Sequence, residues 1–300
     1  MRVGVIGSTG QLGSEVVRAL RDTGHHALPL THVEIDVADA GSVRSALEPL
    51  RPDVVVNCAA YVRVDEAEDR AEEAFRANAL GALRTARAAA DLDALCVYVS
   101  TDYVFDGQKA TPYAEDDTPR PINVYGASKL AGEVLVQQAC PRWLIVRTAG
   151  LFGARGARGK GSNFVESIIA RARQGQPVTV VDDVRTSPTY ARDFSTALMY
   201  LLEHEVTGIV HLANAGTCTW FEFAEAIIRD VGMAVVPQRI SSDELGARAR
   251  RPRQSALTSG RAADLKMEEL RPWRAALQAY LLETGHITAD RPAAPEGIPS

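Results

Sequence analysis

The sequence predicts an α/β protein, with a doubly wound parallel sheet and a smaller C-terminal substrate-binding domain. Short apolar runs alternate with helical segments as far as about residue 150. The first run enters a glycine-rich turn. Small or hydroxyl residues stand at the ends of several runs: Gly7, Ala59, Thr101 and Thr148. In such sheets the carboxyl ends of the strands share one edge, where ligands bind.

Composition and charge narrow the class of protein. The net charge of −5 argues against a general nucleic-acid binder, which normally carries a basic excess. We expect neither a signal peptide nor a membrane partner, because the chain starts directly with a strand and lacks an apolar run of spanning length. Four scattered cysteines show no metal-binding spacing, so we expect no metal site and reduced thiols in a cytoplasmic protein: Cys58, Cys96, Cys140 and Cys218.

The first strand and the turn after it predict a phosphate site. Residues 3–6 form a short apolar strand, and a helix is expected from Ser14 to about Arg21. The glycines between them allow the backbone to approach a pyrophosphate, which the free N–H groups of the helix then face. A tight turn without a ligand is the alternative interpretation. The cofactor-binding residues predicted here are Gly7, Gly10, Gln11, Leu12 and Gly13.

The end of the second strand bears on which nicotinamide cofactor binds. This strand is expected near residues 27–30, and an acid often follows it in dinucleotide-binding folds, where it holds the adenosine ribose. Here Thr31 and His32 follow, with no carboxylate to repel a 2′-phosphate. The sequence therefore favours NADPH, with NADH as the alternative. We expect Asp36 and Val37 at the adenine edge; Asp36 also suits the N-cap of a helix beginning near Ala40.

Two further strands supply the middle of the predicted site. The β-branched run 54–57 predicts a strand that is covered on both faces. Small residues after it would let a ligand lie against the backbone, and an alanine-rich helix of about 69–91 follows. The strand 95–100 then delivers Thr101. Further cofactor contacts are expected from Ala59, Ala60, Tyr61 and, from within that helix, Asn78.

A tyrosine and a lysine four residues apart predict proton chemistry. Tyr125 and Lys129 lie on the same face of a predicted helix, 125–138. The lysine ammonium would lower the pKa of the phenol and make it a usable proton donor near neutral pH. Alone, such a pair also occurs by chance; its value here comes from the preceding Thr101 and the N-terminal glycine turn.

The second half of the chain has a different texture. We expect residues 1–150 to form the dinucleotide-binding domain, 151–300 to form mainly the substrate-binding domain, and about 176–214 to return to the first. Residues 153–162 are rich in glycine and arginine and suited to ordering on an anion, while the tail 288–300 is expected to be disordered. The arginine cluster 248–253, which includes Arg251, is either a solvated loop or a diphosphate site.

Taken together, these motifs resemble one family. The glycine turn, the run Ser100 to Phe105 and the run Tyr125 to Glu133 resemble the extended short-chain dehydrogenase/reductases, and more narrowly the dTDP-4-dehydrorhamnose reductase group. The resemblance covers nearly the whole chain. It also includes Arg147-Thr148, Ser187-Pro188-Thr189, Thr219-Trp220 and Arg251-Pro252 with Ser255.

The resemblance implies a Rossmann-like fold and a reductase activity. A hydride would pass from NADPH to the C4 ketone of a dTDP-4-keto-6-deoxysugar, with dTDP-L-rhamnose as the best-supported product. Tyr125 would protonate the nascent alkoxide, Lys129 would tune it and hold the nicotinamide ribose, and Thr101 would bind the ketone oxygen. Contacts with the nucleotide sugar are expected from Thr101, Asp102, Tyr103 and Arg251. No nucleic-acid or membrane partner is expected, and a homodimer is compatible with this class.

One departure from the family leaves the sugar open. Where the family commonly has a tryptophan soon after the Arg147-Thr148 strand end, this chain has Gly150 followed by Leu151. An aromatic ring that would pack on the sugar is therefore missing, and we expect a larger pocket than in family members that have the tryptophan. Three alternatives follow: a ketoreductase for another nucleotide deoxysugar in secondary metabolism, a non-catalytic NADP-binding regulatory subunit, and an epimerase or dehydratase of the superfamily.

Overall fold

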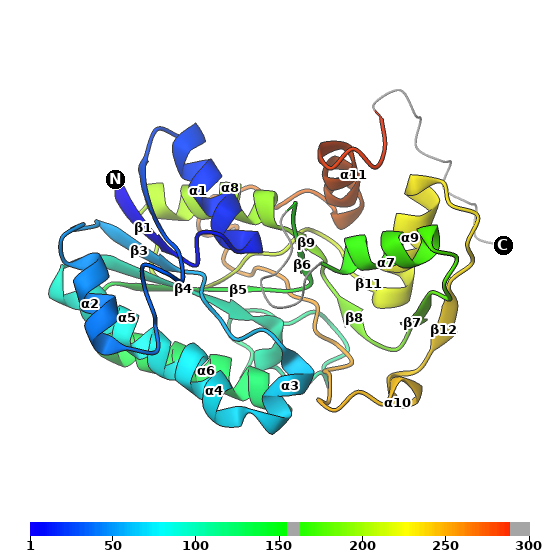
Figure 1. The fold of residues 1–300 in the computed structure, drawn as a ribbon, viewed down its shortest axis with the longest axis horizontal. Coiled ribbons are helices and arrows are strands. Elements are labelled where there is room, and N and C mark those ends of the chain that lie inside the picture. Colours follow the sequence, from blue (N-terminus) through cyan, green and yellow to red (C-terminus); the bar gives the residue numbers. More distant parts are fainter. Residues whose placement is uncertain (155–162, 289–300) are drawn as a thin grey trace.

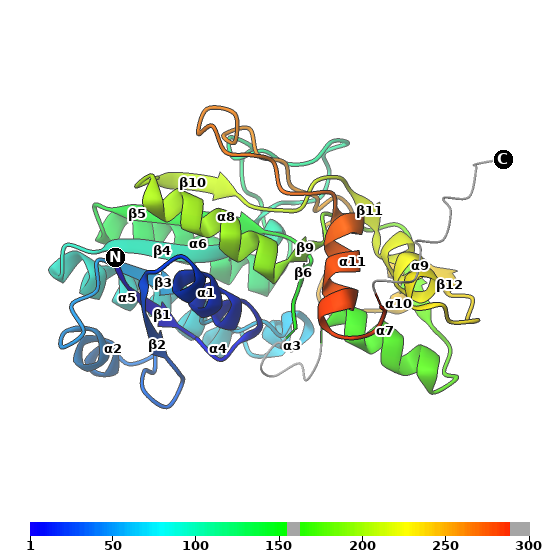
Figure 2. The ribbon, with the colours of Figure 1, turned by 90° about the horizontal axis from the view of Figure 1, so that it is seen from above.

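A six-stranded, fully parallel sheet forms the centre of the computed structural model, which describes residues 1–154 and 163–288. The strand order is β10-β5-β4-β3-β1-β2: β2 lies on one side of β1, and the later strands are added in order on its other side (Figure 2). This confirms the predicted doubly wound fold. The strands are β1 (Arg2–Ile6), β2 (His26–Leu30), β3 (Val54–Asn57), β4 (Leu95–Thr101), β5 (Trp143–Thr148) and β10 (Gly208–His211).

Helices cover both faces of this sheet, as its apolar strands require (Figure 1). One apolar core lies between the sheet and the helices α1 (Gln11–Asp22) and α8 (Ala191–Glu203). A second core lies on the opposite face, under α2 (Ala40–Leu47), α5 (Gly81–Asp91) and α6 (Val124–Ala139). All four residues of β3, Val-Val-Val-Asn, are buried between the two layers.

The predicted alanine-rich helix of 69–91 is not continuous. It is divided into α3 (Val64–Asp69), α4 (Ala71–Phe75), a π-helical turn η1 (Arg76–Leu80) and α5. Such π turns are rare and often occur at functional sites. Asn78 lies in this turn, and its side chain bonds outside the helix. The N-cap of α2 is Asp39, whose side chain accepts from the backbone N–H groups of Gly41 and Ser42, so the assignment of the cap to Asp36 is wrong.

Beyond the sheet edge, three small two-stranded sheets and four helices surround a separate apolar core. Helix α9 begins with the capping box of Thr219 and Glu222. Figure 1 shows these elements beside the carboxyl ends of the central strands. They are β6 (Leu151–Phe152) with β9 (Thr189–Tyr190), β8 (Arg185–Thr186) with β11 (Cys218–Thr219), β7 (Thr179–Val181) with β12 (Gln238–Ile240), α7 (Phe164–Arg173), α9 (Trp220–Val231), α10 (Ser242–Leu245) and α11 (Trp273–Glu283).

The range 176–214 divides between the two parts. Helix α8 packs on the central sheet and β10 extends it, whereas β7 pairs with β12 outside it. The division of the chain into domains at residue 150 stays a prediction. The expected disordered tail lies almost wholly outside the described residues, as does most of the glycine- and arginine-rich stretch. Within the described ranges, no helix combines the length and the apolar character needed to span a bilayer.

Candidate active site

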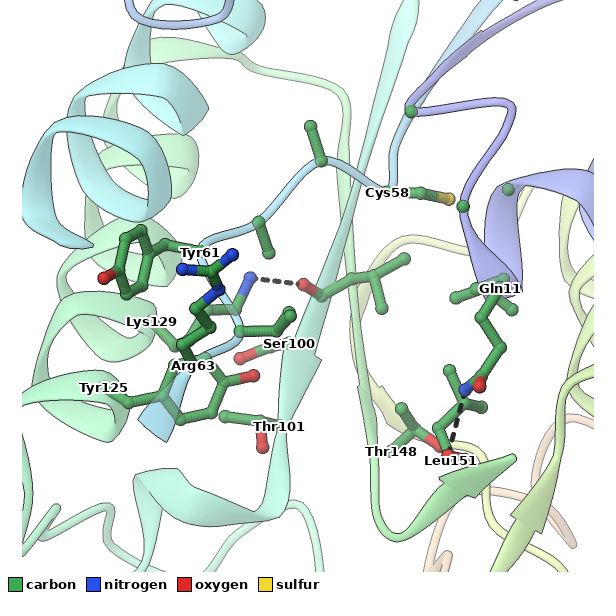
Figure 3. A pocket seen from close by; sticks show the side chains of 18 of the residues that line it. Gln11, Cys58, Tyr61, Arg63, Ser100, Thr101, Tyr125, Lys129, Thr148 and Leu151 are labelled. Atoms are coloured by element: carbon green, nitrogen blue, oxygen red, sulfur yellow. Dashed lines mark hydrogen bonds between the residues drawn. The ribbon is translucent and has the colours of Figure 1, made fainter. Parts of the chain in front are cut away.

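A cleft of about 800 Å³ runs along the carboxyl edge of the sheet and brings together most of the predicted site (Figure 3). Its walls come from the glycine turn, from the ends of β3, β4 and β5, from α6, and from the opposite small core. The predicted residues that line it are Gly7, Gly10, Gln11, Leu12, Gly13, Val37, Ala59, Ala60, Tyr61, Thr101, Asp102, Tyr103, Tyr125 and Lys129.

The glycine turn is shaped so that only glycine fits at two of its positions. A Cβ atom on Gly13 would lie 2.2 Å from the carbonyl oxygen of Gly7, and Gly7 itself has φ +77°. Gly10 differs: an added Cβ would meet only this same oxygen, at 3.2 Å, and would otherwise face the cleft. The turn therefore presents bare backbone and the start of α1 to the cleft, as a phosphate site requires.

The acid-base group lies at the opposite wall. Tyr125 is in the first turn of α6, which the side chain of Asn123 caps by accepting from the Gly126 N–H at 2.7 Å. Figure 3 shows Tyr125 beside Thr101 and Lys129 at one end of the cleft. Burial raises the pKa of the Tyr125 phenol, and a hydrogen bond with the Thr101 hydroxyl opposes this. The phenol is consequently protonated at neutral pH and suited to donating a proton.

Lys129 does not act on Tyr125 as the spacing predicts. Its ammonium donates to the carbonyl oxygen of Val99 at 2.7 Å and lies 4.0 Å from the centroid of the Tyr98 ring. Burial lowers the pKa of Lys129 to about 7, and the charge of Glu133 opposes this shift. Burial raises the phenol pKa, against the predicted lowering, and the effect that opposes burial comes from the Thr101 hydroxyl.

Thr101 and Asp102 form a hydrogen-bonded pair where β4 ends. The Thr101 hydroxyl donates to Asp102 Oδ1 at 2.9 Å and accepts from the Tyr103 N–H at 3.2 Å. Asp102 is buried, and this burial raises the pKa of its carboxyl to about 6. The Tyr103 ring meets Tyr125 edge-on, with 5.9 Å between the ring centroids. The end of β4 and the start of α6 thus present one hydroxyl, one carboxyl and two aromatic rings to a polar ligand of the size of a sugar.

Three predicted residues do not line the cleft. Asp36 accepts from the Ala38 N–H within its own loop. Asn78 is fully buried behind the wall, where it bonds the backbone of Tyr61 and the hydroxyl of Ser128. Asn78 therefore holds the loop after β3 against α6 and does not line the cleft in which the cofactor contact was predicted.

Arg251 is the third of these residues. Its guanidinium pairs with both carboxylate oxygens of Asp65, the closer contact being 2.6 Å, and it hydrogen-bonds the Tyr103 side chain. Arg248 pairs with Asp69 on the same helix, α3. These two members of the arginine cluster are thus paired with carboxylates, and both pairs are at least partly exposed. The choice between a solvated loop and a diphosphate site stays a prediction.

The cleft brings the predicted residues next to others that were not predicted as ligands from the sequence. Gln11 donates through Nε2 to the Leu151 carbonyl oxygen at 2.9 Å, which joins the glycine turn to β6. The rings of Phe164 and Trp220 lie 4.6 Å apart in the opposite wall. Among the lining residues are Cys58, Arg63, Thr148, Asn163, Phe164 and Trp220. Asn163 and Phe164, at the start of α7, could be found only through the tertiary fold. Trp220 was already marked by the Thr219-Trp220 motif.

Comparison with known proteins agrees with this geometry. The family model described as the RmlD substrate binding domain matches residues 1–285. The chain is 39% identical to the dTDP-4-dehydrorhamnose reductase of Mycolicibacterium smegmatis (97% of this chain, 88% of that protein). It is also 39% identical to the spore coat polysaccharide biosynthesis protein SpsK of Bacillus subtilis (94% of this chain, 97% of that protein).

A solved structure is similar over almost the same span. The dTDP-4-dehydrorhamnose reductase of Bacillus anthracis, in complex with NADP, superposes with a TM-score of 0.90 at 35% identity, covering 94% of this chain and 99% of that one. Fold, cleft and sequence similarity lead to the same conclusion. The chain belongs to the dTDP-4-dehydrorhamnose reductase family of the extended short-chain dehydrogenase/reductases.

Proposed function

We propose that this protein is an NADPH-dependent reductase of a dTDP-4-keto-6-deoxysugar, with dTDP-4-dehydrorhamnose as the best-supported substrate and dTDP-L-rhamnose as the product. One observation carries the proposal. The protonated Tyr125 phenol, the Thr101 hydroxyl and the Lys129 ammonium converge at one end of a cleft whose other end is a bare glycine turn. This is the arrangement that ketone reduction by a dinucleotide needs.

The residues present fit a dinucleotide. Gly10 leaves the backbone accessible at the start of α1, and Val37, Ala59 and Ala60 give the cleft small or apolar walls. Among the buried polar atoms of cleft residues without a hydrogen-bond partner in the described part of the chain are Oε1 of Gln11 and Oγ1 of Thr148. NADPH bound along this surface would supply the hydride. The similar Bacillus anthracis reductase in complex with NADP supports NADPH over NADH. The end of β2 does not, because the Glu34 carboxylate accepts from the Thr31 N–H at 2.7 Å.

Proton transfer is assigned to the residues at the end of β4 and the start of α6. Tyr125 would donate its phenolic proton to the ketone oxygen as negative charge develops there. Lys129 would hold the nicotinamide ribose beside Tyr125. Thr101 would turn its hydroxyl proton from Asp102, which accepts it in the structure, to the ketone oxygen and hold that oxygen in reach of Tyr125. Stabilising the developing oxyanion in a water-poor site is the main source of rate.

Gly150 supports a second candidate substrate. It lines the cleft with φ +51°, and a side chain there would meet Pro188 Cα and Thr186 Oγ1 at 3.1 Å. The sugar end of the cleft thus lacks a large side chain from this position. Two relatives act, by their names, on other deoxysugars: a dTDP-4-keto-6-deoxy-D-glucose reductase of Streptomyces niveus and a probable 4-ketoreductase of Streptomyces antibioticus. A ketoreductase for such a sugar is the alternative.

The test is NADPH oxidation, followed at 340 nm, with a panel of dTDP-4-keto-6-deoxysugars that includes dTDP-4-dehydrorhamnose. Turnover with one panel member at a kcat/KM of about 10⁴ M⁻¹s⁻¹ or more would support the proposal. NADPH binding without turnover on any sugar would instead support the regulatory-subunit interpretation. The four free cysteines support a cytoplasmic location. Size-exclusion chromatography would test the proposed homodimer.

A further inference from the structure

A buried ion pair lies directly behind the acid-base group. Glu133 and Arg147 are each 1% exposed. Arg147 donates through Nε and Nη2 to the two carboxylate oxygens of Glu133, at 2.9 and 2.7 Å. The Ser100 hydroxyl donates to the same carboxylate at 2.5 Å. Because dehydrating two charges offsets much of their attraction, stability alone is a weak reason for such a pair.

The carboxylate of Glu133 joins β4 and α6, which carry the proposed catalytic residues, to β5, which ends at the cleft. Ser100 immediately precedes Thr101 on β4, and Arg147 immediately precedes Thr148 on β5. Glu133 itself stands one helical turn after Lys129 on α6. A single side chain therefore sets how the ends of β4 and β5 lie against the helix that presents Tyr125 and Lys129.

The same carboxylate is the negative charge that acts on Lys129. Two other titratable groups beside Lys129 are neutral near pH 7: burial raises the pKa of the Cys58 thiol to about 12 and raises that of Tyr98. Asp102, whose pKa burial raises to about 6, acts on the Tyr125 phenol. Val99 contributes a carbonyl oxygen. Arg147 extends from Glu133 toward His211, whose pKa is lowered by burial, and toward the Phe105 ring.

We propose that Glu133 is a positioning residue for the reduction: its carboxylate aligns the ends of β4 and β5 with α6 and supplies the negative charge that keeps the Lys129 ammonium in place. This inference rests on the proposed function for its kinetic meaning, but its electrostatic part can be measured without turnover. Glu133 reaches the reaction only through Lys129, Ser100 and Arg147.

The direct test is an NMR titration of Lys129. The chain has four lysines, so protein labelled with ¹³C at lysine Cε gives few signals, and Lys129→Arg identifies the one that belongs to Lys129. In the wild type this signal should titrate near pH 7. In Glu133→Gln it should titrate roughly one pH unit lower, because an opposing charge has been removed. An unchanged midpoint would overturn the electrostatic part of the proposal.

A second variant guards against misfolding. Glu133→Gln leaves the Arg147 charge buried without its carboxylate, which is strongly destabilising. The double variant Glu133→Gln/Arg147→Gln removes both charges and should fold. If Glu133 only holds the fold, the double variant should regain the wild-type Lys129 midpoint. If Glu133 acts on Lys129, the midpoint should stay lower than in the wild type, and lower than in Arg147→Gln.

The kinetic readout separates this inference from the proposed function. With a Lys129 midpoint one pH unit lower, kcat/KM for the sugar should fall about fivefold at pH 7 and only about twofold at pH 6. Purely structural damage would give the same loss at both pH values. If the wild type turns over no sugar but Glu133→Gln shows the expected shift of the Lys129 midpoint, the proposed function is contradicted and the effect of Glu133 on Lys129 stands. If the wild type is active but the midpoint does not shift, the proposed function stands and the effect of Glu133 on Lys129 is contradicted.

Discussion

At the scale of single residues, the site is organised around a phenol that stays protonated. Burial raises the pKa of Tyr125, and Lys129 is turned toward the Val99 carbonyl oxygen. The protonated phenol can give its proton to a developing alkoxide, as ketone reduction requires.

Removing the phenol hydroxyl should separate chemistry from binding. Tyr125→Phe keeps the ring and its edge-on contact with Tyr103 but cannot donate a proton. We expect kcat to fall by about 10²–10⁴-fold while the Kd for NADPH stays within about threefold. Stopped-flow NADPH oxidation and fluorescence titration measure the two quantities. Turnover at the wild-type rate would mean that another group donates the proton.

Asp102 should make stability depend on pH in a defined direction. Its pKa is about 6 in the folded protein against an ordinary 3.8, so the folded state binds this proton more tightly. The stability it provides is complete below pH 3.8 and is lost as pH rises through 6, a cost of roughly 3 kcal/mol.

Asp102→Asn removes this titration while keeping the shape of the side chain. Compared with the wild type, the variant should gain stability at pH 8 and lose that advantage by pH 4. Urea unfolding at both pH values is the measurement. An equal difference at pH 4 and pH 8 would show that the carboxyl is not held in the state inferred here.

At the scale of elements, the glycine turn illustrates how one motif serves two purposes. Gly13 is required by packing, since a Cβ atom would lie 2.2 Å from the Gly7 carbonyl oxygen. Gly10 has only a 3.2 Å contact with the same atom and faces the cleft, so its requirement is for the ligand.

Valine substitutions should distinguish these two requirements. Gly10→Val should reduce NADPH affinity at least about 100-fold, because its side chain blocks the approach to the backbone, while the Tm changes little. Gly13→Val is the matched control and should lower the Tm strongly and lose binding with it. Calorimetry and NADPH titration report both effects. Tight NADPH binding by Gly10→Val would remove the cofactor from this turn.

The secondary-structure elements also show which parts of the fold and the site could be predicted from the sequence. The strands, the glycine turn and the approach of Thr101 to Tyr125 follow from local pattern and from the rule that parallel strands end at one edge. The π turn at Asn78 could not be predicted, because helix patterns do not reveal a one-residue widening that depends on side-chain bonds to Tyr61 and Ser128. The phenol pKa depends on burial, which spacing alone does not contain.

At the scale of the whole molecule, long-range ion pairs connect the C-terminal segment to the nucleotide-binding side. Arg251 and Asp65 are 186 residues apart in sequence, a pairing that no local pattern indicates. The pair is partly exposed, and its direct value to stability is at most about 1 kcal/mol. Arg251 also hydrogen-bonds the Tyr103 side chain, so the pair helps to hold that ring at the cleft.

Loss of Arg251 should therefore affect the sugar more than the cofactor. Arg251→Ala is expected to raise the KM for the nucleotide sugar about tenfold, through a less constrained Tyr103, and to leave the KM for NADPH unchanged. Arg248→Ala, which breaks the more exposed pair with Asp69, is the control and should change neither. Equal effects of Arg251→Ala on both substrates would assign the arginine to the fold alone.

The proposed function depends on the transfer of a hydride from NADPH to C4 of a nucleotide sugar in this cleft. The most direct measurement uses NADPH that carries deuterium at the transferred C4 position, dTDP-4-dehydrorhamnose as substrate, and NMR of the product. We predict a product with one deuterium at C4 of the sugar, and none formed by Tyr125→Phe. NADPH that binds but keeps its deuterium, with the ketone unreduced, would contradict the account.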